Sequence, residues 1–222
     1  MSYSIAIDGP AGAGKSTIAK KIAKKLNFIY VDTGAMYRAM ALFMIQKQVD
    51  REAEELIGTI CKEADITIVY ENGEQQVILN GSNVTKLLRT EEAGKMASFV
   101  AKNKNVRKKL VDLQQKMAKT TDVIMDGRDI GTCVLPEADV KIYLTASSKE
   151  RALRRYKELV EKGVTCDLDE IEKDIIARDE QDMNREVSPL KKAEDAILVD
   201  SSNMTIDEVV ERIIDIFCKK MK

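Results

Sequence analysis

The chain has 222 residues, of which 44% are hydrophobic and 33% charged, and its formal net charge is -1. This length and apolar content exclude a disordered or fibrous protein and predict one domain with a sizeable insertion. The balanced charge gives no general basic field for nucleic acid or an anionic membrane, so any anion-binding site must be local. Histidine is absent, which excludes His-dependent triads, HExxH zinc sites and imidazole general bases.

The cysteines and the N-terminal residues indicate the compartment. Four cysteines lie far apart with no CxxC pair, which argues against a zinc site or a disulfide scaffold and fits a reducing compartment. The first residues, MSYSIAID, lead directly into a strand-like run without a basic segment or a long apolar stretch. This pattern predicts neither a signal peptide nor a membrane span. We therefore expect a cytoplasmic protein without membrane association.

Short apolar runs that end in turn or acidic residues predict five strands, at residues 4–9, 28–34, 122–129, 140–146 and 196–202. Segments with helical periodicity separate them, which is typical of an α/β fold whose parallel sheet is covered by helices on both faces. Ligands of such folds bind beyond the carboxyl ends of the strands. The residues that fall near those ends are Asp8, Asp32, Asp126, Thr145 and Asp200.

The first predicted strand leads into a segment with the P-loop pattern GxxxxGK[ST]: Gly9, Pro10, Ala11, Gly12, Ala13, Gly14, Lys15 and Ser16. The amphipathic run TIAKKIAKKL follows it, so the segment has the strand before it and the helix after it that a P-loop requires. Its glycines let backbone N–H groups surround phosphate oxygens at a helix N-terminus. We expect Lys15 to reach the β- and γ-phosphates and Ser16 to hold Mg²⁺. A glycine-rich turn without a ligand is the alternative.

The second predicted strand is followed by residues 33–46, in which Arg38 is the one charged side chain. If a helix begins after Asp32 and Thr33, Arg38 lies in its first two turns, near the helix end that favours anions. This placement predicts an anion next to Arg38. The alternative is a structurally paired arginine, for example one bonded to Asp32.

Residues 65–85 depart from the alternation of strands and helices, because two β-type runs surround Asn72-Gly73. An Asn-Gly pair between such runs predicts a hairpin with a type I′ turn. We expect a small antiparallel insertion over residues 60–98. A stabilising flap and a direct ligand-binding role both remain open for it.

Arginines recur in the second half of the chain. Arg107 lies in a helical segment, and Arg128 follows a strand end at Asp126-Gly127. Residues 147–150 resemble a capping box that opens a helix, and this helix carries Arg151, Arg154 and Arg155 on one face. The alternative for the arginines of residues 151–155 is a solvated helix face on which they pair with glutamates. The alternative for Asp126 is a residue that only forms a turn.

A second polar group, Arg178, Asp182 and Arg185, follows a turn-like segment at residues 160–170. The two helical segments on either side of this turn are expected to close over bound phosphates as a lid. Phosphoryl transfer depends mostly on positioning and electrostatic stabilisation, so a protein without histidine can catalyse it.

A P-loop alone does not distinguish a small-molecule kinase from a GTPase or a motor ATPase. A GTPase should carry an NKxD motif and a DxxG switch, and neither is convincing in this chain. A motor or helicase normally needs a longer chain and partner domains. The arginines therefore favour a kinase, and a nucleotide-dependent switch that meets a protein or RNA partner is the alternative from another class.

Five segments together resemble the bacterial cytidylate kinases, a branch of the nucleoside monophosphate kinases: IDGPAGAGKST, VDTGAMYRA, DGRDIGT, VKIYLTASSKERALRR and RDxxDxNR at residues 178–185. The resemblance runs in order from residue 4 to about residue 202. It implies a P-loop kinase fold with a five-stranded parallel sheet, a small antiparallel insert and a helical lid. The implied division is a core of residues 1–59 and 99–222, a monophosphate-binding insert of residues 60–98, and a lid of about residues 151–188.

The resemblance also implies roles for single residues. Those expected to bind ATP are Gly9, Pro10, Ala11, Gly12, Ala13, Gly14, Lys15, Ser16 and Thr17, with Ser16 as the Mg²⁺ ligand. Those expected to bind CMP are Thr33, Arg38, Ser98, Arg107, Arg128, Asp129, Arg178, Asp182 and Arg185. Those expected to stabilise the transferred phosphoryl group are Lys15, Arg128, Arg151 and Arg155.

The implied activity is ATP-dependent phosphorylation of CMP, with dCMP as a second substrate, in pyrimidine nucleotide metabolism. We expect a monomer whose partners are small-molecule nucleotides and not nucleic acid. The chain departs from the family pattern at Thr33, where many members have serine, and at Gln181 and Met183, where some carry extra lid arginines. A sister kinase that acts on UMP, dTMP or AMP is the nearest alternative.

Overall fold

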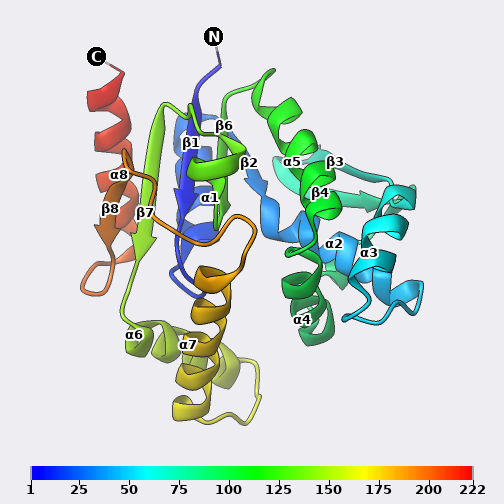
Figure 1. Cartoon of the computed structure of the whole chain (residues 1–222). Helices are drawn as coiled ribbons and strands as arrows, with labels where there is room; N and C mark the ends of the chain where they lie inside the picture. Colours follow the sequence, from blue (N-terminus) through cyan, green and yellow to red (C-terminus); the bar gives the residue numbers. More distant parts are fainter. Residues whose placement is uncertain (1, 222) are drawn as a thin grey trace. The chain divides into compact units, whose positions relative to one another are not determined.

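Eight strands form two sheets in the structure, a computed structural model that describes residues 2–221 (Figure 1). The first is a five-stranded sheet in the order β2-β6-β1-β7-β8, and the second has the order β3-β4-β5. The strands of the first sheet are β1 (Ser4–Asp8), β2 (Ile29–Asp32), β6 (Val123–Gly127), β7 (Val140–Thr145) and β8 (Ile197–Asp200). Those of the second are β3 (Ile66–Glu71), β4 (Glu74–Leu79) and β5 (Ser82–Asn83). Each of the five predicted strands lies within its predicted range, which confirms the α/β fold with a small antiparallel sheet.

Helices occupy the segments between the strands. The α-helices are α1 (Lys15–Leu26), α2 (Thr33–Gln46), α3 (Glu54–Ile60), α4 (Glu91–Val100), α5 (Lys104–Ala118), α6 (Ser148–Glu161), α7 (Leu168–Asn184) and α8 (Ile206–Lys220). Three shorter helical segments are η1 (Cys61–Glu63), η2 (Thr85–Leu87) and the π-helix η3 (Ile130–Val134). None of the helices between residues 2 and 221 is both long and apolar enough to cross a lipid bilayer.

The chain divides into two compact units, which are described separately. Unit 1 consists of residues 3–28 and 124–221. In this unit β1 pairs in parallel with β7, and β7 with β8. Ile5, Ala6 and Ile7 on β1 are fully buried, as expected for a parallel strand that is covered on both faces. Helices α1 and α8 pack against each other, α1 on β1 and α8 on β7.

Helices α6 and α7 of unit 1 lie side by side (Figure 1). The Ser147 hydroxyl accepts a hydrogen bond from the Glu150 N–H at 3.2 Å and so caps α6, which confirms the predicted start of this helix. The predicted turn between the helices is also present, because α6 ends at Glu161 and α7 begins at Leu168. Gly163 in this turn has φ +73°, a conformation that favours glycine.

Unit 2 contains residue 2 and residues 29–123. Its helix α2 packs against α4, α5 and the strands of the second sheet, and Met36, Met40 and Met44 on α2 are fully buried. Strands β3 and β4 are antiparallel and are joined by Asn72 and Gly73, which have φ values of +53° and +77°. Positive φ at both positions is what a type I′ turn requires, so the predicted hairpin is confirmed.

Gln114 on α5 provides a test of packing in unit 2. Its side chain is fully buried, and neither its amide nitrogen nor its amide oxygen has a hydrogen-bond partner among the described residues. Because a buried amide without partners costs free energy, we expect Gln114→Met to raise the free energy of unfolding by about 1–2 kcal/mol. Urea unfolding measures this change. The exposed neighbour variant Lys116→Met is the control, and a loss of stability in Gln114→Met contradicts the prediction.

Candidate nucleotide-binding site

The segment between β1 and α1 in unit 1 has the backbone of a phosphate-binding loop. Gly9, Gly12 and Gly14 have φ values of +152°, +72° and +83°, which side chains other than glycine rarely adopt. A Cβ atom at Gly9 would lie 1.9 Å from the Leu144 carbonyl oxygen on β7. The loop therefore depends on glycine for its shape, and it directs the chain into the N-terminus of α1, where backbone N–H groups favour anions.

Lys15 at the start of α1 is a buried cation, with a relative exposure of 6%. Its ammonium group donates a hydrogen bond to the Pro10 carbonyl oxygen at 2.6 Å. Burial and the nearby Arg128 charge lower the pKa of Lys15 well below its ordinary value, while the carboxylates of Asp126, Asp8 and Asp182 act in the opposite direction. The loop thus holds a cation whose charged form is poorly solvated, and an anion bound there stabilises it.

Ser16 and Asp126 bring two oxygen ligands together beside the loop. The Ser16 hydroxyl donates to Asp126 Oδ2 at 2.8 Å, from the first turn of α1 to the strand β6. A P-loop hydroxyl and a carboxylate fit Mg²⁺, which takes one or two protein ligands and completes its shell with phosphate oxygens and water. No cluster of three or more Asp, Glu, Cys or His side chains suited to a metal occurs within residues 2–221.

Four of the predicted CMP-binding residues in unit 1 form two ion pairs. Arg128 Nε donates to Asp182 Oδ2 at 2.7 Å, and Arg185 Nη2 lies 3.5 Å from Asp129 Oδ1, with both side chains less than 10% exposed. The Arg128 charge also acts on Lys15. The structure therefore groups Arg128 and Asp182 with the P-loop lysine.

The other predicted residues of unit 1 lie on α6 and α7. Arg151 is buried and bonds to Ala11 of the P-loop and to Asp179. Arg155 is exposed and forms an ion pair with Glu158 of its own helix at 3.1 Å. Arg178 lies exposed on α7. Of these three arginines, only Arg151 is buried.

In unit 2 the predicted residues lie on α2 and on the two helices α4 and α5, which pack against it. Thr33 is the first residue of α2 and is buried. Arg107 on α5 is buried, with its guanidinium 5.7 Å from the centre of the Tyr37 ring of α2. Ser98 on α4 donates to the Gly94 carbonyl oxygen at 3.5 Å.

Arg38 lies in the second turn of α2, as predicted, since the helix begins at Thr33 and Asp32 caps it by accepting from the Ala35 N–H at 2.8 Å. The position of a Cβ atom at Gly34 would be 3.6 Å from the Arg38 guanidinium nitrogens, so the guanidinium lies over the first turn of α2. Within residues 2–221 it forms neither a hydrogen bond nor an ion pair. A half-buried guanidinium at a positive helix end favours an anionic ligand.

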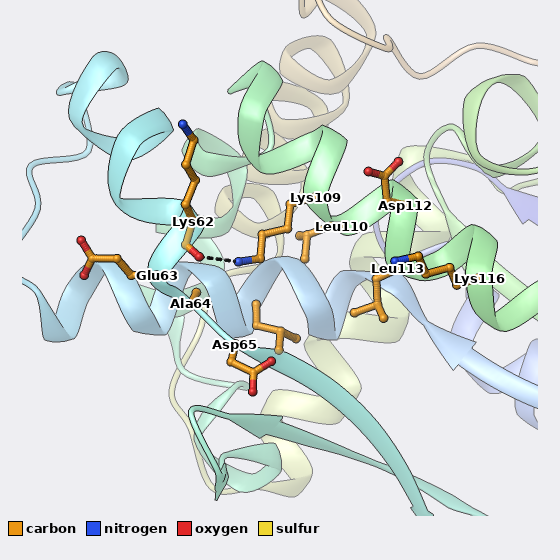
Figure 2. A pocket seen from close by; sticks show the side chains of 10 residues that line it. Lys62, Glu63, Ala64, Asp65, Lys109, Leu110, Asp112, Leu113 and Lys116 are labelled. Atoms are coloured by element: carbon orange, nitrogen blue, oxygen red, sulfur yellow. Dashed lines mark hydrogen bonds between the residues drawn. The ribbon is translucent and has the colours of Figure 1, made fainter.

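A separate cavity of about 420 Å³ in unit 2 contains none of the predicted residues (Figure 2). It lies between α5 and the segment from Lys62 to Ile66. Lys109 on its wall donates to the carbonyl oxygens of Cys61 and Lys62 at 3.0 Å each. Lys109 thus caps the end of η1, and the rest of the wall carries charges of both signs.

Comparison with known proteins identifies the family. A family model described as cytidylate kinase matches residues 5–219. The chain belongs to the cytidylate kinase family. Cytidylate kinases from Alkaliphilus oremlandii and Bacillus subtilis are 53% and 48% identical to it, over 96% of this chain in each case and over 96% and 95% of their own lengths. A cytidylate kinase from Lactobacillus gasseri is 52% identical over 98% of this chain and 95% of its own length.

Among solved structures, an uncharacterized protein from Eubacterium ventriosum matches with a TM-score of 0.56 over 99% of both chains. Its sequence identity is 14%, so this likeness supports the fold alone.

Asp8 is buried. The sequence predicts only that it lies near the end of a strand. Its carboxylate accepts hydrogen bonds from the N–H groups of Ile130 and Gly131 at 2.7 Å each, directly after Asp129. Burial raises its pKa to about 6, the Asp129 charge adds to the rise, and the two N–H groups and Lys15 oppose it. Asp8 thus fixes the backbone that follows a predicted CMP-binding residue.

The raised pKa of Asp8 predicts how stability depends on pH. Between its ordinary value of 3.8 and about 6, the folded state binds more protons at Asp8 than the unfolded state, so wild type loses stability as pH rises through this window. The loss is on the order of 3 kcal/mol. Asp8→Asn lacks this titration, although it also loses one of the two hydrogen bonds.

Urea unfolding of wild type and Asp8→Asn between pH 4 and pH 7 measures the effect. The free energy of unfolding of the variant minus that of wild type should increase by about this amount as pH rises. A difference that stays constant or decreases over the range contradicts the raised pKa of Asp8.

Proposed function

We propose that this protein transfers the γ-phosphoryl group of ATP to CMP, and to dCMP as a second substrate, in pyrimidine nucleotide metabolism. The supporting observation is a P-loop with a buried lysine in a chain whose relatives, about half identical over nearly their whole length, are named cytidylate kinases. The family name supports CMP as the acceptor, and the P-loop supports a nucleoside triphosphate as the donor.

The donor is bound by residues 9–17. The backbone N–H groups of the loop and the N-terminus of α1 face the triphosphate, and Lys15 bonds to its β- and γ-oxygens. Ser16 holds Mg²⁺, and Asp126, already bonded to Ser16, orients that hydroxyl. When bound, the ion neutralises charge that develops on the phosphate oxygens.

The acceptor is bound through charge. Arg38, Arg128 and Arg185 bond to the α-phosphate of CMP, a role that the unpartnered Arg38 supports. Arg128 and Arg185 are held by Asp182 and Asp129, so CMP must replace these partners or share them. Arg178 and Asp182 contact the sugar hydroxyl groups.

The base is recognised by Asp129, Arg107 and Ser98. A carboxylate accepts from the N4 amino group of cytosine, while an arginine donates towards N3 and O2. Uracil has a carbonyl group where cytosine has the amine, so the Asp129 carboxylate repels it. Thr33 helps to place the nucleotide.

Transfer requires no general base, because the attacking phosphate oxygen of CMP is ionised at neutral pH. Lys15, Arg128, Arg151 and Arg155 stabilise the charge on the transferred group. For Arg151 and Arg155 this role requires a change of partners, because Arg151 is bonded to Asp179 and Arg155 to Glu158.

We propose further that residues 1–59 and 99–222 act as the core, residues 60–98 as the monophosphate-binding insert and about residues 151–188 as the lid. The protein acts as a monomer in the cytoplasm, without nucleic acid or membrane partners. The four cysteines are free, as a reducing compartment allows.

The acceptor is tested by ADP release with CMP, dCMP, UMP, dTMP and AMP. We expect the highest kcat/KM with CMP and dCMP. Asp129→Ala should raise KM for CMP by about 10- to 100-fold, because it removes the hydrogen-bond acceptor for the cytosine amine, and should leave KM for ATP nearly unchanged. Wild-type preference for another monophosphate overturns the proposal, and equal losses for CMP and ATP exclude base recognition by Asp129.

The donor site is tested by Lys15→Ala. Removing a cation that stabilises the transferred group should lower kcat by about 10²–10³-fold, while circular dichroism shows a retained fold. Lys24→Ala, at an exposed position near the end of the same helix, is the matched control and should keep wild-type kcat. Undiminished turnover in Lys15→Ala contradicts the P-loop assignment.

A further inference from the structure

Two buried side chains from α6 and α7 hold one peptide unit of the P-loop. Asp179 Oδ1 accepts a hydrogen bond from the Ala11 N–H at 3.0 Å, and Arg151 Nη1 donates to the Ala11 carbonyl oxygen at 2.8 Å. The two side chains also pair with each other at 2.5 Å. Both the donor and the acceptor of Ala11 are therefore satisfied by the helices that follow β7.

This arrangement is tightly constrained. Arg151 and Asp179 are 6% and 5% exposed, and Arg151 Nε donates in addition to the Ala146 carbonyl oxygen at 2.9 Å. A Cβ atom at Gly12 would lie 3.4 Å from the Arg151 Cβ atom, so α6 packs directly on the loop. Buried charges with this many hydrogen bonds are held in one well-defined geometry. The P-loop residue that bonds to them is therefore held in place as well.

The pair also sets the charge beside the loop. Alone, the Asp179 carboxylate would repel a triphosphate, whereas paired with Arg151 it adds no net charge. Asp179 can thus hold the Ala11 N–H without opposing the donor, as long as Arg151 is present.

We propose that Arg151 and Asp179 are a positioning pair for ATP, which fixes Ala11 and so keeps the following N–H groups of the P-loop directed at the donor phosphates. The inference rests on the proposed function, because it assumes that ATP binds this loop. It gives Asp179 a role in positioning the donor, and it gives Arg151 an action on the loop in addition to the proposed action on the transferred phosphate.

A positioning role predicts how much each variant weakens ATP binding. Arg151→Met removes the donor to the Ala11 carbonyl oxygen and leaves an unpaired carboxylate beside the phosphates, so it should weaken ATP binding most. Asp179→Asn leaves one acceptor oxygen for two donors, the Ala11 N–H and Arg151, but it adds no repulsion, so its effect should be smaller. The double variant Arg151→Met, Asp179→Asn should recover part of the ATP affinity that Arg151→Met loses.

Calorimetric titration of ATP and of CMP, each alone, tests this order. We expect the ATP dissociation constant to rise roughly tenfold in Asp179→Asn, since ordering one backbone residue costs about this factor, and further in Arg151→Met. The CMP constant should stay within about twofold of wild type. Lys157→Met, at an exposed position of α6, is the matched control and should change neither constant.

Each other outcome overturns the proposal. Unchanged ATP affinity in folded variants excludes a positioning role. If the variants bind ATP and CMP equally more weakly and have a lowered melting temperature, the ion pair only stabilises the fold. A fall in kcat with unchanged ATP affinity assigns Arg151 to the transferred group. Because ATP binding is measured without an acceptor, an error in the proposed acceptor leaves these results intact.

If Arg151→Met does not fold, Arg151→Lys replaces it in the same titrations. Lysine retains the charge beside Asp179 but lacks the guanidinium fork that reaches Ala11, Ala146 and Asp179 together. ATP binding should still weaken selectively in this variant, and wild-type ATP affinity would reject the proposal.

Discussion

The arrangement of charged groups in unit 1 depends on the burial of the Lys15 ammonium group. A buried cation is costly unless opposite charges lie near it, and the carboxylates of Asp8, Asp126 and Asp182 supply them. Each of these carboxylates accepts hydrogen bonds from another part of the unit: Asp8 from the backbone of η3, Asp126 from Ser16 and Asp182 from Arg128. The groups that stabilise the lysine thereby fix the parts of the proposed site around it.

The same constraint explains why the arginines of unit 1 are paired while Arg38 is not. Arg128 and Arg185 lie among buried groups, where an unpaired charge would destabilise the fold, and they use Asp182 and Asp129 as partners. Arg38 is only half-buried, so water solvates part of its charge. In the proposed reaction, CMP gains affinity at Arg38 without replacing a partner, whereas at Arg128 and Arg185 it must compete with a carboxylate.

Local patterns predicted the fold well. The strands, the P-loop between β1 and α1, the start of α2 after Asp32 and the Asn72-Gly73 hairpin all depend on residues that are close in sequence. The environments of Arg151 and Arg155 could not be predicted in this way. Their spacing places them on one face of α6, but one is buried against Ala11 and the other is 51% exposed, since helical periodicity does not specify what lies opposite each turn.

The contacts of Asp8 and Asp179 could not be predicted from the sequence either. Asp8 bonds to residues 122 and 123 positions away, and Asp179 to one 168 positions away, and no pattern in a single sequence pairs such positions. The chemistry of these residues gave no signal either, because an aspartate at a strand end or within a helix is common. The roles proposed for the ligand-binding residues stay predictions, since they concern contacts with nucleotides.

The segment from Leu144 to Arg151 shapes the P-loop at three points. The Leu144 carbonyl oxygen leaves no room for a side chain at Gly9, the Arg151 Cβ atom lies against Gly12, and the Arg151 guanidinium bonds to Ala11 between them. Arg151 is in turn tied to the end of β7 through Ala146. Because the steric and the polar constraints come from one continuous segment, the loop's shape depends on how α6 leaves β7, and a rotation of α6 about Ala146 would act on Ala11 and Gly12 together.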